Sequence, residues 1–258
     1  MIDINFAKVE FKDYLKSYDI TNPKIDLKIT HTYKVVDSAE YIAKGLNLDK
    51  EDYDLALFIA LLHDIGRFEQ IKLFDAYDDR KVDHAELGVK ILFDDGLIRK
   101  FIKDDSYDEI IKKAIANHNK YKIDEEGMTD RELLHSKIIR DADKLDNFRV
   151  KEEESFEALI GKGATEETVA NSTISDGIYN TFFEKKLIRK YERETYLDHW
   201  VSYIAFIFDF NFKESLKYIK ENDYINRSVD RINYINPETK ERMENIRKFA
   251  NEYINSFK

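Results

Sequence analysis

The sequence has 258 residues, and its 52 acidic side chains outnumber the 42 lysines and arginines, which gives a net charge of −10. This balance argues against a nucleic-acid polymer as partner, because such binding needs a basic surface that releases counterions from phosphates. Apolar residues make up 43% of the chain, enough to bury a sizeable core and exclude general disorder. The chain has no cysteine, which excludes disulfides and thiolate ligands, so any metal must be held by nitrogen and oxygen.

No part of the sequence has the pattern of a targeting or membrane segment. The first residues include an acidic side chain and no long apolar stretch, unlike a secretory signal. The longest uninterrupted apolar run covers residues 55–62, far below the roughly 20 residues that a membrane span needs. We therefore expect a cytoplasmic protein without a membrane partner.

Helical periodicity dominates the first half of the chain. Residues 31–42 repeat apolar side chains at the intervals of one helix face. Residues 55–64 are apolar nearly all round, which predicts a central helix with neighbours on every side. The helical pattern returns over residues 84–92. Ser106 followed by Glu109 has the spacing of a capping box and predicts the start of the next helix.

The second half of the chain continues the helical pattern. Thr129 and Glu132 repeat the capping-box spacing before a helix expected to run to about Arg149. Residues 200–208 and 236–253 predict two later helices. Strand alternation is not found in the sequence. These patterns predict an all-α fold.

One change in composition occurs in the chain, at residues 150–177, where glycine, serine, threonine and asparagine gather. This segment has three interpretations: a linker between domains, an excursion that caps a site, or a polar loop with a short helix, which we favour. We therefore expect a single helical domain over residues 1–258. Its core, at about residues 26–150, holds the motifs described next, and residues 151–258 supply additional helices that are candidates for a lid.

Four of the six histidines fall on apolar helix faces: His31, His63, His84 and His118. One such histidine is most often a hydrogen-bonded core residue. Four of them on different predicted helices, each at or near a helix end, need a common explanation, because packed helices can bring such side chains to one point. Imidazole is the commonest protein ligand of metals, which suggests a metal site. We interpret the other two, His135 and His199, as structural.

Asp64 and Asp143 are the carboxylates best placed to complete such a site. Asp64 follows an apolar run that should bury it, and a buried carboxylate needs a cation nearby. Asp143 lies on the inward side of its predicted helix, and on that ground we favour it over Asp141. Asp141 and Asp146 have the structural alternative of capping a helix or forming a salt bridge.

The sequence resembles the HD-domain superfamily of metal-dependent phosphohydrolases. The superfamily's signature H…HD…D is matched, in order, by His31, His63, Asp64 and Asp143. The segment LLHDIGR holds the His-Asp pair, and ADKLD holds the last aspartate. The resemblance covers about residues 26–150 and implies the all-helical fold of that superfamily.

The resemblance extends to the two histidines between the His-Asp pair and the last aspartate, as in superfamily members that hold two metal ions. It implies that one ion is bound by His31, His63, Asp64 and Asp143. It implies that the second ion is bound by His84 and His118 together with a bridging Asp64. The alternative is one ion, with His84 and His118 contacting a substrate phosphate. The implied cofactors are thus one or two divalent transition-metal ions, such as manganese or iron.

Several cations flank these motifs and are candidates for neutralising a phosphate. Arg67, three residues after Asp64, and Lys144, next to the last predicted ligand, are expected to join Asp64 in catalysis and to bind substrate. Arg80 and Lys122 are further candidates for substrate binding. Each of these cations has the alternative role of a solvated surface charge.

The leading hypothesis is a hydrolase that uses metal-activated water on a nucleotide or another small phosphate ester. The cyclic-dinucleotide phosphodiesterases of the superfamily carry a Gly-Tyr-Pro element after the last histidine. The segment after His118 reads NKYK, without proline, which argues against that substrate. The alternatives are a di-iron HD-type oxygenase and a non-catalytic nucleotide sensor. The sequence leaves the ester, the metal and the number of subunits open.

Overall fold

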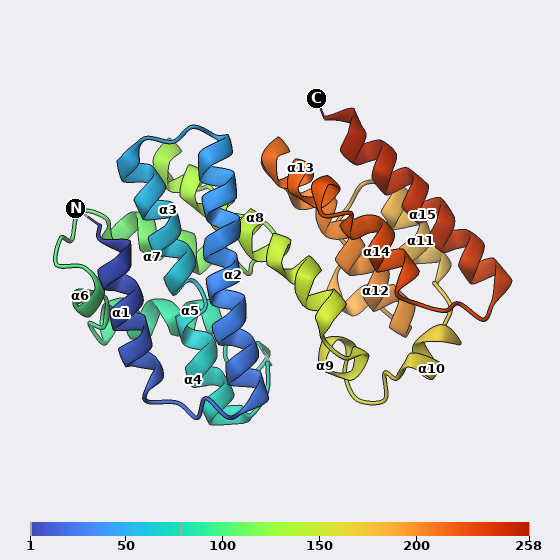
Figure 1. The fold of residues 1–258 in the computed structure, drawn as a ribbon, viewed down its shortest axis with the longest axis horizontal. Coiled ribbons are helices and arrows are strands. Elements are labelled where there is room, and N and C mark those ends of the chain that lie inside the picture. The colour runs from blue at the N-terminus through green and yellow to red at the C-terminus, as the bar shows by residue number, and fades with distance from the viewer. Residues whose placement is uncertain (1, 78, 258) are drawn as a thin grey trace. The chain divides into compact units, whose positions relative to one another are not determined.

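A computed structural model describes residues 2–77 and 79–257 of the chain. Within these ranges the secondary structure consists of helices joined by turns and loops, without strands, which confirms the all-α prediction (Figure 1). The scarcity of proline and glycine, with 2 and 8 residues, leaves long stretches free to form helices. No helix among the described residues is long and apolar enough to cross a membrane.

The chain divides into two compact units, Met1–Asp146 and Asn147–Lys258. The expectation that residues 1–258 act as one domain stays a prediction. The helices of the first unit are α1 (Ile4–Leu15), α2 (Pro23–Gly45), α3 (Lys50–Leu62), α4 (Ile65–Phe74), α5 (His84–Val89), α6 (Ile98–Phe101) and α7 (Asp108–Asn117). A long helix, α8 (Asp130–Glu153), begins in the first unit and ends in the second.

The core of the first unit lies around α3, which packs along α2 (Figure 1). Every side chain of α3 from Asp54 to Leu62 is buried, as the sequence predicted for a central helix. Asp49 begins this helix by accepting a hydrogen bond from the Asp52 amide. Burial on all sides fixes the carboxyl end of α3, where His63 follows directly.

Two glycines let α4 and α5 pack at very short range. A Cβ atom on Gly66 would lie 2.3 Å from the carbonyl oxygen of His84 and 2.4 Å from the amide nitrogen of Gly88. Real Cβ atoms do not make such contacts, so the position requires glycine. This close approach brings the first residue of α5, His84, next to the start of α4.

One predicted helix start is confirmed, and two other details at helix ends differ from the sequence prediction. The capping box of Thr129 and Glu132 forms, with hydrogen bonds in both directions. The one expected at Ser106 and Glu109 does not form, because the Ser106 amide donates to Asp104 and α7 begins after Tyr107 without a side-chain cap. The expected helix at residues 84–92 ends earlier, at Val89, and continues as a π-helical turn, Lys90–Asp94.

The second unit continues with α9 (Phe156–Ile160), α10 (Glu166–Ala170), α11 (Asp176–Phe183), α12 (Tyr196–Ile204), α13 (Lys213–Glu221), α14 (Tyr224–Asp230) and α15 (Pro237–Ser256). Its core is aromatic: the Trp200 ring packs edge-on to Phe156 at 5.3 Å, and its indole donates to the Ser228 carbonyl at 2.9 Å. Phe182 and Phe208 pack in the same way, at 5.0 Å. The composition change at residues 150–177 corresponds to the loops around the short helices α9 and α10.

Candidate metal centre

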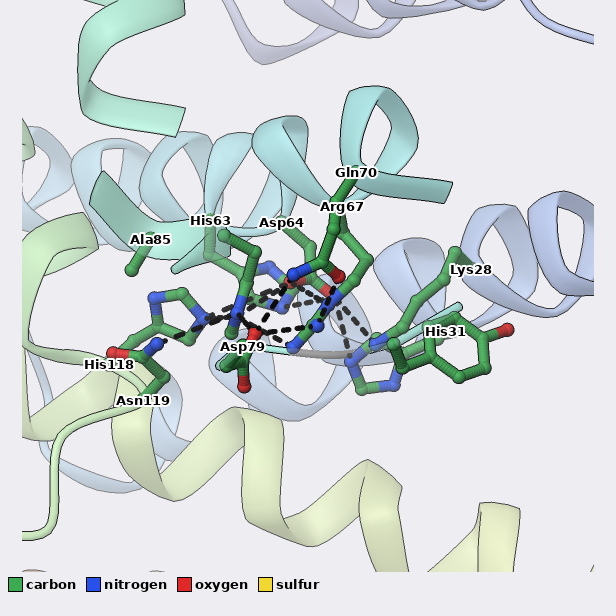
Figure 2. Close-up of polar contacts among 12 residues, drawn as sticks. Lys28, His31, His63, Asp64, Arg67, Gln70, Asp79, Ala85, His118 and Asn119 are labelled. Atoms are coloured by element: carbon green, nitrogen blue, oxygen red, sulfur yellow. Dashed lines mark hydrogen bonds and ion pairs between the residues drawn. The ribbon is translucent and has the colours of Figure 1, made fainter. Parts of the chain in front are cut away.

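Four histidines and Asp64 meet at one buried point of the first unit, and each comes from a different place in the chain. His31 lies inside α2, so the expectation that it lies near a helix end is wrong. His63 and Asp64 form the turn between α3 and α4. His84 is the first residue of α5, and His118 directly follows α7. Figure 2 shows His31, His63 and His118 directed toward Asp64 from different sides.

The two carboxylate oxygens of Asp64 face different pairs of histidines. Its Oδ2 lies 3.7 Å from the Nε2 atoms of both His31 and His63. Its Oδ1 lies 3.3 Å from Nε2 of His84 and 3.8 Å from Nε2 of His118. Each half of this arrangement has the spacing of a metal site, with ligand atoms within 4.8 Å of one another. Asp64 is common to both halves, as a bridging ligand would be.

His63 and His118 are oriented by backbone carbonyls. The Nδ1 of each ring donates at 2.7 Å to the carbonyl three residues earlier, Ala60 for His63 and Ile115 for His118. With Nδ1 protonated, the neutral ring presents the lone pair of Nε2 to the centre. Burial lowers the pKa of His63, and burial together with the neighbouring histidines holds that of His118 well below its usual range. Both rings are therefore neutral and able to bind a metal at neutral pH.

His31 and His84 are oriented by carboxylates. The Nδ1 of His31 lies 2.6 Å from Asp146, and the Nδ1 of His84 lies 2.7 Å from Asp79. Such pairs of a carboxylate and a histidine fix the ring and raise its basicity as a metal ligand. The Nε2 of His63 is buried and has no hydrogen-bond partner. A metal ion between the His31 and His63 rings would satisfy this atom, so the residues present fit this group.

Asp143, from α8, lies on the side of the first histidine pair. Its Oδ1 is 3.1 Å from Nε2 of His31 and 4.0 Å from Nε2 of His63. Although burial opposes ionisation, the nearby histidines hold the pKa of Asp143 far below its ordinary value. The structure thus puts Asp143 on the ligand side of the His31 ring and Asp146 on its outer side.

Lys28 is a neighbour of the cluster that the sequence analysis missed. Its Nζ lies 2.7 Å from Oδ2 of Asp64, and its side chain is only 17% exposed. Although burial raises it, the pKa of Asp64 is held well below the usual range by Lys28, by histidines and by Arg67. Lys28 lies three residues before His31, so both share one face of α2 (Figure 2). The three-residue spacing between Lys28 and His31 is the feature of the sequence from which Lys28 could have been predicted.

Arg67 lies beside the second histidine pair, as its position in the motif suggested. Its guanidinium donates to Gln70 at 2.6 Å, to Asp79 at 2.9 Å and to Nε2 of His84 at 3.1 Å. These contacts involve the two terminal nitrogens of the guanidinium. The Nε of Arg67 is buried and has no hydrogen-bond partner. Sequence reasoning did not find Gln70 or Asp79, because neither belongs to a motif.

The other predicted cations are placed less centrally. Lys144 is buried on α8, next to Asp143. Arg80 and Lys122 are exposed in the loops before α5 and after α7. The assignments of Arg67, Lys144, Arg80 and Lys122 to catalysis or substrate binding stay predictions. His135 lies outside the cluster with its Nε2 3.0 Å from Asp52, a structural contact.

Comparison with known proteins agrees with this geometry. The family model of the HD domain matches residues 29–147, a segment that contains every predicted metal ligand. No curated protein and no solved structure matches the chain. HD domains are usually metal-dependent hydrolases. The match and the buried cluster of histidines and aspartates together show that residues 29–147 of this chain belong to the HD-domain family.

Proposed function

We propose that this chain is a metal-dependent phosphohydrolase that cleaves a nucleotide or another small phosphate ester. The observation that carries the proposal is the position of Asp64 between two pairs of histidines, with one carboxylate oxygen toward each pair. Two adjacent ions sharing a carboxylate are a common arrangement in phosphate-ester hydrolysis. The HD family, usually hydrolytic, supports the same reaction class.

The donor atoms suit divalent transition metals, and we propose manganese, iron or a similar ion as the cofactor. Such an ion supplies a bound water of near-neutral pKa and draws charge from a phosphoryl oxygen. The protein's own contribution is to hold the ligands before binding. Hydrogen bonds from each Nδ1 fix all four rings, and burial excludes bulk water from the Nε2 atoms.

Two cations are placed to offset the charge of a phosphate at this centre. Lys28 reaches Asp64 from α2, and Arg67 reaches His84 from α4. Both lie over the ring of Tyr77, with Lys28 Nζ 5.7 Å and Arg67 Cζ 5.9 Å from the ring centre. We propose that these cations, with Lys144 as a further candidate, bind the substrate phosphate.

The test is phosphate release from a panel of nucleotides and sugar phosphates by the full chain loaded with manganese or iron. We expect release by the parent and its loss in Asp64→Ala, with Asp37→Ala as control because Asp37 is exposed on α2. Oxygen consumption without phosphate release would instead support the di-iron oxygenase. Nucleotide binding without either reaction would support the sensor, and both results would overturn the proposal.

A further inference from the structure

The turn that follows α7 carries His118 and has little regular structure of its own. His118 is buried, whereas residues 120–122, shortly after it, are exposed and lie outside the helices. Two backbone hydrogen bonds of this turn, donated by the amides of His118 and Lys120, are 3.4 Å long, beyond the usual range. The backbone of the turn alone therefore holds His118 weakly.

Arg140, a buried residue of α8, contacts this turn through its guanidinium. One terminal nitrogen donates to the carbonyl of Asn117 at 3.0 Å and also to the carbonyl of Lys120. The other terminal nitrogen donates to the carbonyl of Tyr121 at 3.3 Å. These three carbonyls come before and after His118 in the chain. One side chain of α8 thus fixes the backbone on both sides of the histidine.

The chemistry of arginine suits this contact. Asn117 ends α7, and the last carbonyls of a helix lack partners within the helix and carry partial negative charge. A planar guanidinium presents several donors in a fixed geometry, which a lysine ammonium does not reproduce. Hydrogen bonds from a charged donor are stronger than those between neutral groups. Arg140 therefore holds carbonyls that no regular element pairs.

The side of α8 that carries Arg140 also serves the other half of the cluster. Asp143 follows Arg140 by three residues, and Asp146 follows Asp143 by three more, so neighbouring members of this series lie side by side on the helix. Asp143 lies 3.1 Å from Nε2 of His31, and Asp146 lies 2.6 Å from Nδ1 of the same ring. One side of α8 thus contacts His31 and holds the turn of His118.

We propose that Arg140 is a positioning residue of the metal centre, which keeps the turn after α7 in place so that His118 faces Asp64. The Nε2 of His118 lies 2.9 Å from Nε2 of His84 and 3.8 Å from Oδ1 of Asp64, and these distances depend on the backbone of the turn. The inference rests on the two-ion centre of the proposed function. It concerns the ion at His84 and His118, because no predicted ligand of the other ion lies in this turn.

The first test is amide hydrogen exchange of the full chain without metal, in the parent and in Arg140→Lys. This substitution keeps the positive charge and removes the guanidinium fork. We expect exchange at residues 118–124 to become at least about 10-fold faster, including the Asp124 amide, which donates to the Asn117 side chain at 2.9 Å. Equal exchange of parent and variant in this segment would overturn the proposal.

The matched control for this exchange measurement is Arg231→Lys. Arg231 is a half-buried arginine of the second unit that also donates to a backbone carbonyl, that of Glu154. The control should leave exchange at residues 118–124 at the parent rate. Faster exchange of this segment in Arg231→Lys as well would show an unspecific effect and would overturn the proposal.

The second test is titration with manganese, followed by electron paramagnetic resonance. Arg140→Met should weaken binding of the ion at His84 and His118 about 10-fold or more, Arg140→Lys should weaken it less, and the other ion should bind almost as in the parent. Equal loss at both positions would indicate a merely structural role and would overturn the proposal. If Arg140→Met does not fold, Arg140→Lys carries the comparison.

The two tests also separate this proposal from the proposed function. Exchange is measured without metal and reports only on the turn that carries His118. A parent that binds one ion, while Arg140→Lys exchanges faster at residues 118–124, would overturn the two-ion centre and support the hold of Arg140 on His118.

Discussion

The two units of the chain hold their buried charges in different ways. In the first unit, Asp64 is surrounded by Lys28, Arg67 and imidazoles, so its negative charge is compensated from several sides. In the second unit, Arg193 has a buried Nε and no ion pair among the described residues. The first charge is compensated by its neighbours, whereas the second has only the ring of Tyr203, whose centre lies 5.9 Å from Arg193 Cζ. Replacing a cation should therefore affect stability differently in the two units.

The largest expected effect comes from the contact that assembles the first cluster. Gly66→Ala places a Cβ atom 2.3 Å from the His84 carbonyl, so α4 and α5 must move apart. We expect a loss of about 3 kcal/mol or more in unfolding free energy, measured by urea denaturation. Gly177→Ala in the second unit is the control, because nothing lies within 4 Å of its Cβ position. It should stabilise by up to about 1 kcal/mol; equal effects of the two substitutions would contradict this packing.

The next prediction compares two half-buried cations, Lys28 in the first unit and Arg193 in the second. Lys28→Met leaves Asp64 without its closest cation and should lower the unfolding free energy of the metal-free protein by about 2 kcal/mol. Arg193→Gln should not lower it, because Arg193 has no anionic partner to leave behind. Lys34→Met, on an exposed position of α2, controls for loss of a lysine. Destabilisation by Arg193→Gln equal to that of Lys28→Met would remove the contrast between the units.

The third prediction concerns Asp79, which contacts His84 and Arg67 in the first unit. Its carboxylate accepts from His84 Nδ1 at 2.7 Å and from Arg67 at 2.9 Å, so Asp79→Asn weakens the orientation of the second histidine pair. We expect the affinity for the second metal ion to fall about 10-fold or more, and that for the first ion to change little. Titration with manganese, followed by electron paramagnetic resonance, measures both. Equal loss at both sites would show that the two halves are not separable.

The smallest predicted effect is a dependence of metal affinity on pH. Burial and Lys28 lower the pKa of His31, but Asp143 and Asp146 outweigh them and raise it above its ordinary value of 6.5. A proton therefore competes with the metal for Nε2, and below that pKa the affinity should fall about tenfold per pH unit. The carboxylates of Asp64 and Asp143 stay ionised in this range, because their pKa values are lowered.

A matched variant tests the sign of this dependence. Asp146→Asn removes one of the groups that raise the pKa of His31, so the proton is lost more easily. The pH at which metal binding is half lost should therefore move down. A metal affinity that does not change with pH in the parent, or a shift upward in the variant, would contradict the role given to His31 and Asp146.

The sequence predicted much of the buried histidine and aspartate cluster because its members lie in local patterns. The His-Asp pair follows an apolar run, and His31 lies on the apolar face of α2, so each could be placed on a helix before the structure was known. Burial of α3 on every side followed from its composition. The all-α fold followed from the same periodicity.

The residues that support the ligands could not be found in this way. Asp79 lies in a loop, and its contact with Arg67 depends on the close approach of α4 and α5 at Gly66. Arg193 follows a short helical turn and belongs to no periodic pattern. The contact of Asp79 with Arg67 depends on tertiary packing, which local spacing does not encode. The absent cap at Ser106 has a local cause instead, because the Asp104 side chain, two residues earlier, accepts the Ser106 amide.

The most direct test of the central claim is the metal content of protein purified without air, determined by elemental analysis for the parent and for Asp64→Ala. If Asp64 bridges two ions, the parent should hold two equivalents of manganese, iron or a similar metal per chain, and the variant should retain neither. A parent that holds no metal even after manganese and iron are added, or a variant that keeps the parent's full content, would contradict the account.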